Sequence, residues 1–249
     1  MKNDLSVIIL TKNEEDNIVD CLESVSFADE TIIIDDNSND RTVELAKQFT
    51  SKVYIHSLNG NFASQRNYAL NLAHNTWVLF LDADERISEK LRDEISREIK
   101  RSGTEGFFIK RVDYVWNNKI HHGEGGNVQL LRLAKKSSGK WKGKVHEQWK
   151  ILGQKKVLNN PIIHIPHATV AKFIADIDEY SEIRAKELSE DNKNSNAFLI
   201  FAYPFGKFTV NYLLKKGYKD GIPGFLYAMI MSMHSFLVRS KLYLLKKNE

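Results

Sequence analysis

Three clusters of polar side chains follow apolar segments within the first ninety residues. They are Thr11-Lys12-Asn13-Glu14, Asp35-Asp36-Asn37-Ser38 and Asp82-Ala83-Asp84-Glu85. In an open parallel sheet, ligands bind beyond the carboxyl ends of the strands, so polar groups at successive strand ends converge on one crevice. A single cluster could simply begin a helix, because Asn and Asp are common helix caps. Three such clusters at successive strand ends indicate a ligand site.

The third cluster has a pattern that suits a metal ion. Asp82 and Asp84 lie two residues apart, directly after an apolar run. Carboxylates in this arrangement can hold a hard divalent cation and leave coordination positions for phosphate oxygens. A cation there would neutralise the charge that develops on a departing diphosphate. The alternative is that Asp84 and Glu85 only precede a helix that begins at Ser88, and the neighbouring clusters favour the metal site.

Strand-like and helix-like segments alternate through the first hundred residues. Apolar runs rich in β-branched residues occupy 5–10, 31–34, 53–55 and 77–81, and helical spacing is found over 18–25, 40–46, 63–73 and 88–99. This alternation predicts a parallel sheet with helices on its faces. Two further strand-like runs, 107–112 and 128–133, predict the second half of the same sheet. The polar stretch 135–144 is expected to form a loop near the site.

The composition is that of an ordinary folded protein. The chain has 249 residues, of which 42% are apolar and 27% charged, enough for one sizeable core and a small appendage. The single cysteine, Cys21, falls on the apolar face of a predicted helix. We expect a buried thiol and a reducing compartment. No secretory signal is expected, because the N-terminus runs directly into a strand.

The C-terminal part of the chain differs in charge and hydropathy. Residues 207–249 hold eight Lys or Arg against two acids, a charge of +6, whereas the whole chain carries +4. Helices are predicted over 173–190 and 224–245, the second with an apolar stripe. Its charge-free stretch is too polar for a membrane span. We expect an interfacial helix attracted to anionic lipid, the alternative being a helix packed on the catalytic domain with a solvated basic face.

Four ordered motifs resemble one enzyme family. The segments SVIILTKNEEDNIVDCLESV, ETIIIDDNSNDRTVELA, QRNYAL and WVLFLDADER are similar to family 2 of the inverting glycosyltransferases, and more narrowly to its lipopolysaccharide core β-glucosyltransferases. The resemblance covers about residues 4–190. It implies the GT-A fold, an α/β fold with a mixed, mostly parallel central sheet flanked by helices and a C-terminal helical extension. It also implies a catalytic domain over 1–168 and a helical, membrane-surface or acceptor-associated region over 169–249.

The resemblance gives four residues a place beside the nucleotide of the sugar donor. Thr11 and Glu14 would lie next to the nucleotide, and Asp36 would hydrogen-bond the uracil ring. Arg66 would face the base or the phosphates.

Four more residues would act nearer the reacting sugar. Asp82 would contact the ribose or the sugar, and Asp84 would bind Mg²⁺ or Mn²⁺. Glu147 closes a Val-His-Glu motif similar to that of the branch and would be the general base for the acceptor hydroxyl. His164, sixteen residues before Tyr180, would reach the diphosphate or the metal. The alternatives are a surface Glu147 paired with a neighbouring lysine and a purely structural His164.

The sequence therefore predicts a metal-dependent, single-displacement transfer from a UDP-sugar to a hydroxyl of a lipopolysaccharide core or other lipid-linked acceptor. The expected location is cytoplasmic, peripheral on the inner face of the cytoplasmic membrane, with the anionic membrane surface as a partner. Haloacid-dehalogenase-type phosphatases are disfavoured, since they carry Asp-x-Asp after the first strand. Sugar nucleotidyltransferases are disfavoured too, since they need a glycine-rich loop there.

Two non-enzymatic functions are alternatives to this prediction. Nucleic-acid binding is disfavoured because the basic residues cluster in an apolar tail rather than on an aromatic sheet face. The alternative that stays open is a non-catalytic membrane-surface binding module on a degenerate transferase scaffold.

Overall fold

The chain folds into two compact units. The computed structural model describes residues 3–125, 128–143, 147–166 and 169–247. The first unit consists of residues 1–111 and 128–164, and the second of residues 112–127 and 165–249. Each unit has its own clusters of buried apolar side chains.

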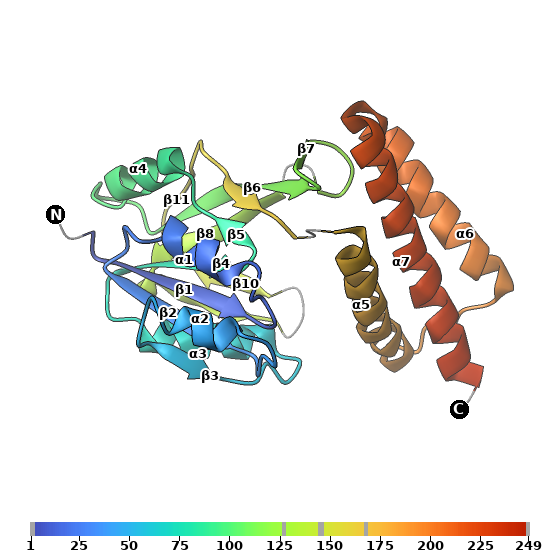
Figure 1. The fold of residues 1–249 in the computed structure, drawn as a ribbon, viewed down its shortest axis with the longest axis horizontal. Helices are drawn as coiled ribbons and strands as arrows, with labels where there is room; N and C mark the ends of the chain where they lie inside the picture. The colour runs from blue at the N-terminus through green and yellow to red at the C-terminus, as the bar shows by residue number, and fades with distance from the viewer. Residues whose placement is uncertain (1–2, 126–127, 144–146, 167–168, 248–249) are drawn as a thin grey trace. The chain divides into compact units, whose positions relative to one another are not determined.

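The first unit contains a mixed sheet whose parallel half comes first in the chain (Figure 1). Its strands β1 (Leu5–Thr11), β2 (Glu30–Asp35), β3 (Val53–Ile55) and β4 (Trp77–Asp82) lie in the order β3-β2-β1-β4. The helices α1 (Ile18–Ser24), α2 (Thr42–Ala46) and α3 (Phe62–Leu72) connect them. Because Thr11 pairs with Asp35 and Leu10 pairs with Asp82, the three polar clusters follow strand ends at one edge of the sheet.

The antiparallel half continues the same sheet. Strand β8 (Val128–Lys135) runs antiparallel to both β4 and β6 (Gly106–Val115). Beyond β6 lie β12 (Ile162–His164) and β5 (Glu85–Arg86), while β7 (Asn118–Ile120) and β11 (Lys155–Val157) pair with β6 outside this order. The predicted fold is thus confirmed: a mixed sheet is flanked by helices and followed by a helical extension.

Alternation along the strands divides the buried side chains between the two faces of the sheet. On one face, Val7 and Ile9 of β1 pack in a cluster with residues of α1 and of α4 (Glu89–Glu98). Cys21 belongs to this cluster and is buried, as predicted. On the other face, Ile8 belongs to a cluster that includes residues of α3.

The prediction of a loop over 135–144 was wrong. A short 3₁₀ turn, η1 (Lys136–Ser138), is followed by β9 (Gly139–Lys142), which pairs with β10 (Gln148–Ile151) in a separate two-stranded sheet. Trp141 and Trp149 stack with their ring centroids 5.4 Å apart, and each meets Phe80 edge-on at 5.2 Å. Two buried tryptophans therefore give a polar segment enough apolar surface to pack on the sheet.

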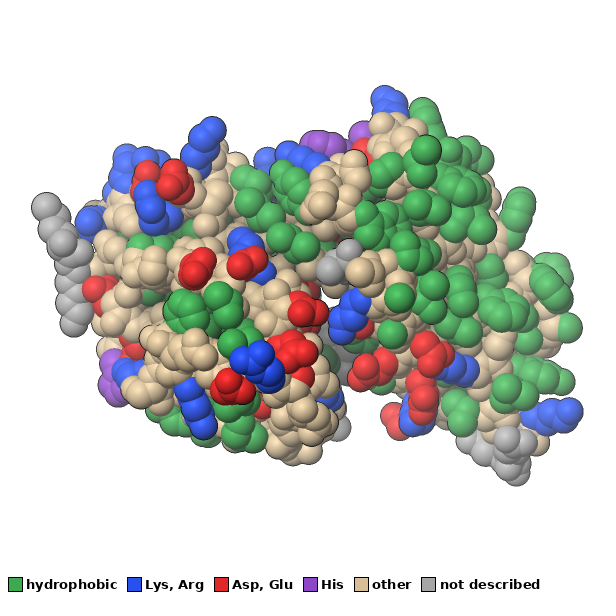
Figure 2. Space-filling model, in the orientation of Figure 1, with side chains coloured by type: hydrophobic (Ala, Val, Ile, Leu, Met, Phe, Trp, Pro, Cys, Tyr) green, Lys and Arg blue, Asp and Glu red, His purple; other side chains and the backbone are tan. Residues whose placement is uncertain are grey.

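The second unit is mainly helical. It contains α5 (Val170–Glu190), α6 (Ala197–Phe208), a π-helical turn η2 (Thr209–Leu214), a 3₁₀ turn η3 (Gly217–Asp220) and α7 (Gly221–Lys247). Helices α5 and α7 correspond to the predicted helices, whereas α6 was not predicted. Helix α7 packs against both α5 and α6. Figure 2 shows apolar side chains gathered over α6 and α7, where many large ones remain exposed.

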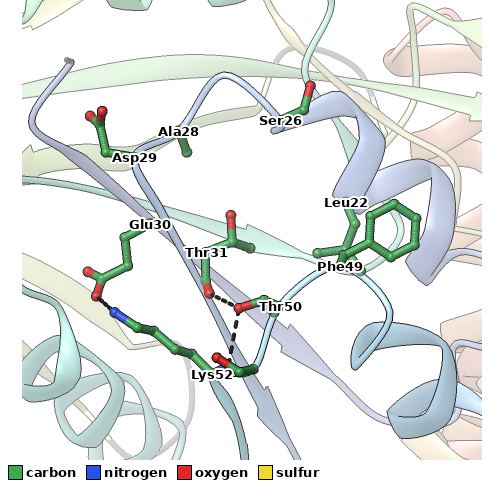
Figure 3. A pocket seen from close by; sticks show the side chains of 10 residues that line it. Leu22, Ser26, Ala28, Asp29, Glu30, Thr31, Phe49, Thr50 and Lys52 are labelled. Atoms are coloured by element: carbon green, nitrogen blue, oxygen red, sulfur yellow. Dashed lines mark hydrogen bonds and ion pairs between the residues drawn. The ribbon is translucent and has the colours of Figure 1, made fainter.

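A cavity of about 400 Å³ lies beside the amino-terminal end of β2 (Figure 3). Glu30 lines it, forms an ion pair with Lys52, lies with its Oε1 2.7 Å from His74 Nδ1, and accepts a hydrogen bond from Ser6. The backbone N–H of His74 also donates to its carboxylate, at 2.9 Å. Burial alone would raise the pKa of Glu30, but the hydrogen bonds from Lys52, Ser6 and His74 outweigh it and lower the pKa to about 2. Glu30 therefore stabilises the end of the sheet opposite the polar clusters.

Replacing Glu30 by Gln should destabilise the protein in a pH-dependent way. Because the pKa is lowered from 4.5 to about 2 in the folded state, the ionised carboxylate stabilises the fold above pH 4.5, and this contribution disappears as the pH falls toward 2. We expect the variant to lose about 1–3 kcal/mol of unfolding free energy at pH 7, and distinctly less at pH 3, in urea titrations. The matched control is Glu44→Gln, since Glu44 is in an exposed surface pair. A difference that does not change with pH would contradict this role.

Candidate functional site

The first two polar clusters are hydrogen-bonded to each other. The backbone N–H of Asn13 donates to Ser38 Oγ at 2.8 Å, and Asn13 Oδ1 accepts from the backbone N–H of Asn39 at 2.8 Å. Asn13 and Asn37 both have a positive φ, near 55°, which Asn tolerates better than most residues. The loops after β1 and β2 therefore form one connected structure at the carboxyl ends of their strands.

The residues expected beside a nucleotide lie on these two loops. Thr11 is buried, and its Oγ1 has no hydrogen-bond partner within the described part of the chain. Asp36 Oδ1 accepts from the backbone N–H of Leu58 at 2.7 Å, and Asp36 Oδ2 lies 3.3 Å from Lys12 Nζ. Glu14 Oε2 accepts from Asn17 Nδ2 at 2.7 Å. The Asp36 carboxylate is thus held by the segment that follows β3, with its other oxygen next to the Lys12 ammonium group.

Arg66 joins two of the predicted site residues. This buried arginine of α3 donates from Nε to Glu147 Oε1 at 2.9 Å and from Nη2 to Asp82 Oδ1 at 3.2 Å. Its guanidinium lies over the Trp141 ring, 4.7 Å from the centroid, so the hairpin of β9 and β10 supports it. Arg66, Asp82 and Glu147 come from three separate elements and meet at the end of β4. Val145 and His146 of the predicted motif lie outside the described residues.

Asp84 and His164 form the second pair at this strand end. His164 Nε2 lies 3.1 Å from Asp84 Oδ2, with His164 on β12 and Asp84 between β4 and β5. The other oxygen, Asp84 Oδ1, is buried and has no hydrogen-bond partner among the described residues. A buried carboxylate oxygen without a partner fits a cation ligand.

Few protein ligands are available for a metal ion at this position. Within the described ranges, no three His, Cys, Asp or Glu side chains are grouped so that they could hold a metal. Mg²⁺ is commonly held by one or two carboxylates, with waters and substrate phosphates completing its coordination. Asp84 therefore fits a cation that is bound together with a phosphate-bearing substrate.

Sequence reasoning missed Arg132, and it placed Glu85 in the third polar cluster without giving it a role. Arg132 of β8 is buried, and its Nη2 lies 2.6 Å from Asp82 Oδ2 and 3.2 Å from Glu85 Oε1. Glu85 Oε2 accepts from the backbone N–H of Asp82 at 3.0 Å. The available signal was an arginine inside the otherwise uncharged run from Val128 to Ala134. A charge in such a run is buried and needs a partner.

The charges around Asp82 determine whether its carboxyl group is ionised. Burial by itself would raise the pKa of Asp82, but the positive charges of Arg132 and Arg66 outweigh burial and hold that pKa well below its ordinary value. Asp82 is therefore a carboxylate throughout the physiological pH range. The site therefore presents the negative charge of Asp82 next to the positive charge of Arg66, which suits a ligand that carries both a cation and an anion.

Comparison with known proteins gives a match over most of the first unit. The family described as "Glycosyl transferase family 2" matches residues 6–171. An uncharacterized glycosyltransferase of Rickettsia typhi is 25% identical over 253 residues, covering 96% of this chain and 86% of the relative. The lipopolysaccharide core biosynthesis glycosyltransferase LpsC of Rhizobium meliloti is 26% identical over 250 residues, covering 96% and 92%.

Solved structures with a similar arrangement are more distant. The chain resembles residues 1–349 of Staphylococcus aureus TarS in complex with UDP-GlcNAc, with a TM-score of 0.46 and 15% identity, over 100% of this chain and 93% of that one. It also resembles glucosyl-3-phosphoglycerate synthase of Mycobacterium tuberculosis in complex with Mg²⁺ and UDP, with a TM-score of 0.36 and 20% identity, over 44% and 43%.

Proposed function

The chain belongs to glycosyl transferase family 2, and we propose that it transfers a sugar from a UDP-sugar to a hydroxyl of a lipopolysaccharide core or other lipid-linked acceptor. The observation that carries the proposal is the meeting of Asp82 and Glu147 on Arg66, beside Asp84, at the carboxyl end of β4. The relative named for lipopolysaccharide core biosynthesis supports the acceptor class. The proposed catalytic domain spans residues 1–168, and the helical region spans 169–249.

The nucleotide is proposed to bind over the ends of β1 and β2. Asp36 has a carboxylate fixed by the backbone of Leu58 and is suited to accept a hydrogen bond from the uracil ring. Thr11 offers a buried hydroxyl that is not used by the described residues, and Glu14 lies on the same loop. Asp82 would contact the ribose or the sugar, and Arg66 would face the phosphates.

Asp84 and His164 are the residues that would hold Mg²⁺ or Mn²⁺. Bound there, the cation would supply positive charge against the leaving diphosphate. The unpartnered Oδ1 of Asp84 is the atom that supports this assignment.

Glu147 is proposed to be the general base. The hydrogen bond from Arg66 Nε, at 2.9 Å, fixes the direction of its carboxylate. Glu147 would take the proton of the acceptor hydroxyl, whose oxygen attacks the anomeric carbon on the side opposite the diphosphate. The bond from the anomeric carbon to the diphosphate breaks as the new glycosidic bond forms, so one displacement inverts the centre and yields a β-linkage from an α-linked donor. Orientation by Asp82 and electrostatic stabilisation would supply most of the acceleration.

The second unit is proposed to bind an anionic membrane surface. Two segments, Ala197–Leu214 and Gly217–Lys247, are long and apolar enough to cross a membrane, by length and composition alone. Phe198, Phe201 and Phe205 of α6 are 75%, 73% and 76% exposed. With Met229 of α7 they line an apolar groove of about 750 Å³. These exposed aromatic side chains would enter the lipid, as in an interfacial helix.

The charges around this apolar surface fit anionic lipid. Residues 193–247 contain nine Lys or Arg and one acid, Asp220. That acid is used internally, since its carboxylate accepts from the backbone N–H groups of His121 and His122. Basic residues next to inserted apolar side chains strengthen binding to anionic lipid. The proposed location is therefore the inner face of the cytoplasmic membrane, where a lipid-linked acceptor is available.

The alternative function is a membrane-surface binding module on a degenerate transferase scaffold. The intact Asp82, Asp84 and Glu147 favour the enzyme. Measurable sugar transfer would exclude the alternative.

Metal-dependent nucleotide binding is the first testable consequence. We expect UDP to bind with micromolar affinity in the presence of Mn²⁺ and much more weakly without it, because the cation links the diphosphate to Asp84. Asp84→Asn should remove the effect of Mn²⁺ in calorimetric titrations. Asp93→Asn is the matched control, because Asp93 is an exposed acid of α4. Failure of the wild-type protein to bind UDP in any condition would contradict the proposed function.

Glu147→Gln should separate donor binding from transfer. The amide keeps the shape of the side chain and cannot accept the proton, so transfer should fall by about 100-fold or more. The dissociation constant for UDP with Mn²⁺ should stay within about threefold of that of the wild type. The measurement is UDP release from a panel of UDP-sugars with lipopolysaccharide core oligosaccharides as acceptors. Near-normal turnover would assign the base to another residue.

The exposed phenylalanines of α6 should control membrane binding. Burying a large apolar side chain in lipid is worth about 1.5–3 kcal/mol, so Phe201→Ser with Phe205→Ser should weaken binding to phosphatidylglycerol-containing vesicles more than tenfold. Co-sedimentation measures the bound fraction. The control pair is Phe49→Ser with Ile55→Ser, which changes two exposed apolar residues of the first unit. Equal sedimentation of both double variants would refute the role of α6.

A further inference from the structure

Arg132 contacts two carboxylates at the end of β4, where the donor is proposed to bind. It lies on β8, next to β4, and is 5% exposed. One nitrogen, Nη2, contacts Asp82 Oδ2 at 2.6 Å and Glu85 Oε1 at 3.2 Å. The shorter contact is made to Asp82, the more exposed of the two carboxylates.

The two oxygens of Asp82 are held by different arginines. Oδ1 accepts from Arg66 at 3.2 Å, and Oδ2 accepts from Arg132. With one cation on each oxygen, the plane of the carboxylate is fixed. The Asp82 side chain is still 34% exposed, whereas those of Arg66 and Arg132 are each 6% exposed. The Asp82 carboxylate is therefore partly exposed to solvent, whereas the two arginines that hold it are buried.

Glu85 contacts both Arg132 and the backbone of Asp82. Its side chain is fully buried, and its second oxygen accepts from the backbone N–H of Asp82. The same carboxylate thus holds both Arg132 and the backbone of the residue that Arg132 orients. Burial raises the pKa of the Glu85 carboxyl, and the positive charge of Arg132 opposes that rise, so the two groups can be buried together.

We propose that Arg132 is a positioning residue for the sugar donor, acting by fixing the Asp82 carboxylate in the direction in which it contacts the donor. This inference rests on the proposed function, since it requires that Asp82 touch the nucleotide-sugar. A residue that only neutralised Glu85 would stabilise the protein and leave donor affinity unchanged. The two roles can therefore be separated by experiment.

Arg111 provides the matched control. It lies on β6, the other neighbour of β8, and its Nη1 is 3.9 Å from Glu85 Oε1. Arg132→Lys and Arg111→Lys make the same chemical change near the same buried carboxylate, but only Arg132 contacts Asp82. Lysine keeps the positive charge and loses the planar guanidinium that sets the direction of the hydrogen bonds.

The experiment compares binding of UDP and of a panel of UDP-sugars by calorimetry, at saturating Mn²⁺, in the full-length protein and its variants, so that a contact of Asp82 with either the ribose or the sugar is detected. We expect Arg132→Lys to raise the dissociation constant at least tenfold and Arg111→Lys to change it less than threefold, with similar melting temperatures. If Arg132 acts through Asp82, adding Arg132→Lys to Asp82→Asn should weaken binding less than twofold further. Should Arg132→Lys fail to fold, Arg132→Gln combined with Glu85→Gln removes both charges of the buried pair and tests the same expectation.

Each other outcome overturns the proposal. If Arg132→Lys binds UDP and the UDP-sugars as tightly as Arg111→Lys, or if its effect multiplies fully with that of Asp82→Asn, Arg132 does not act through Asp82. If Asp82→Asn binds both UDP and the UDP-sugars as the wild type does, Asp82 does not contact the donor and there is nothing for Arg132 to position. In these cases the wild-type protein still binds UDP, and the proposed function stands. Absence of UDP binding by the wild type would reject both.

Discussion

The need to pair buried charges at the end of β4 governs the arrangement of the first unit. A buried carboxylate or guanidinium is costly unless an opposite charge and hydrogen bonds satisfy it. Arg66 and Arg132 are both buried, and each reaches an oxygen of Asp82. They come from α3 and β8, so both elements must pack against β4 before the charges can meet. The site and the core around it therefore depend on the same contacts.

The hairpin of β9 and β10 extends this dependence to the proposed base. Trp141 and Trp149 stack on each other and meet Phe80 of β4 edge-on, and the guanidinium of Arg66 lies over Trp141. Glu147 directly precedes β10 and accepts from Arg66. The apolar packing of two tryptophans thus sets the position of a carboxylate that is far in sequence from the rest of the site. A change in this aromatic packing would affect the proposed base through Arg66, which lies over Trp141 and donates to Glu147.

The parallel half of the fold could be predicted because its signals are local. Buried runs such as 5–10 and 77–81 alternate with helical spacing, and the chain order of such units determines which strand ends carry the polar clusters. Arg132 could not be placed in the same way, since its partners lie about fifty residues away in sequence and only the pairing of β8 with β4 brings them together. Helix α6 was missed for a different reason. Nearly all of its residues are apolar, so the sequence has too few polar positions to set off one buried face of a helix.

The apolar surface of α6 has a functional meaning in the second unit. A helix that buries one face in a protein core can be polar on the other, but α6 exposes Phe198, Phe201 and Phe205 and still packs against α7. An apolar surface of this kind is stable only where something other than water covers it. The nine basic residues of 193–247 are consistent with the proposed contact with anionic lipid, because they add electrostatic attraction next to this apolar surface. The charge is also segregated, because residues 207–249 carry +6 while the chain as a whole carries only +4. The remainder is therefore slightly negative, so the positive charge that the proposed contact with anionic lipid would use is concentrated in the helical region.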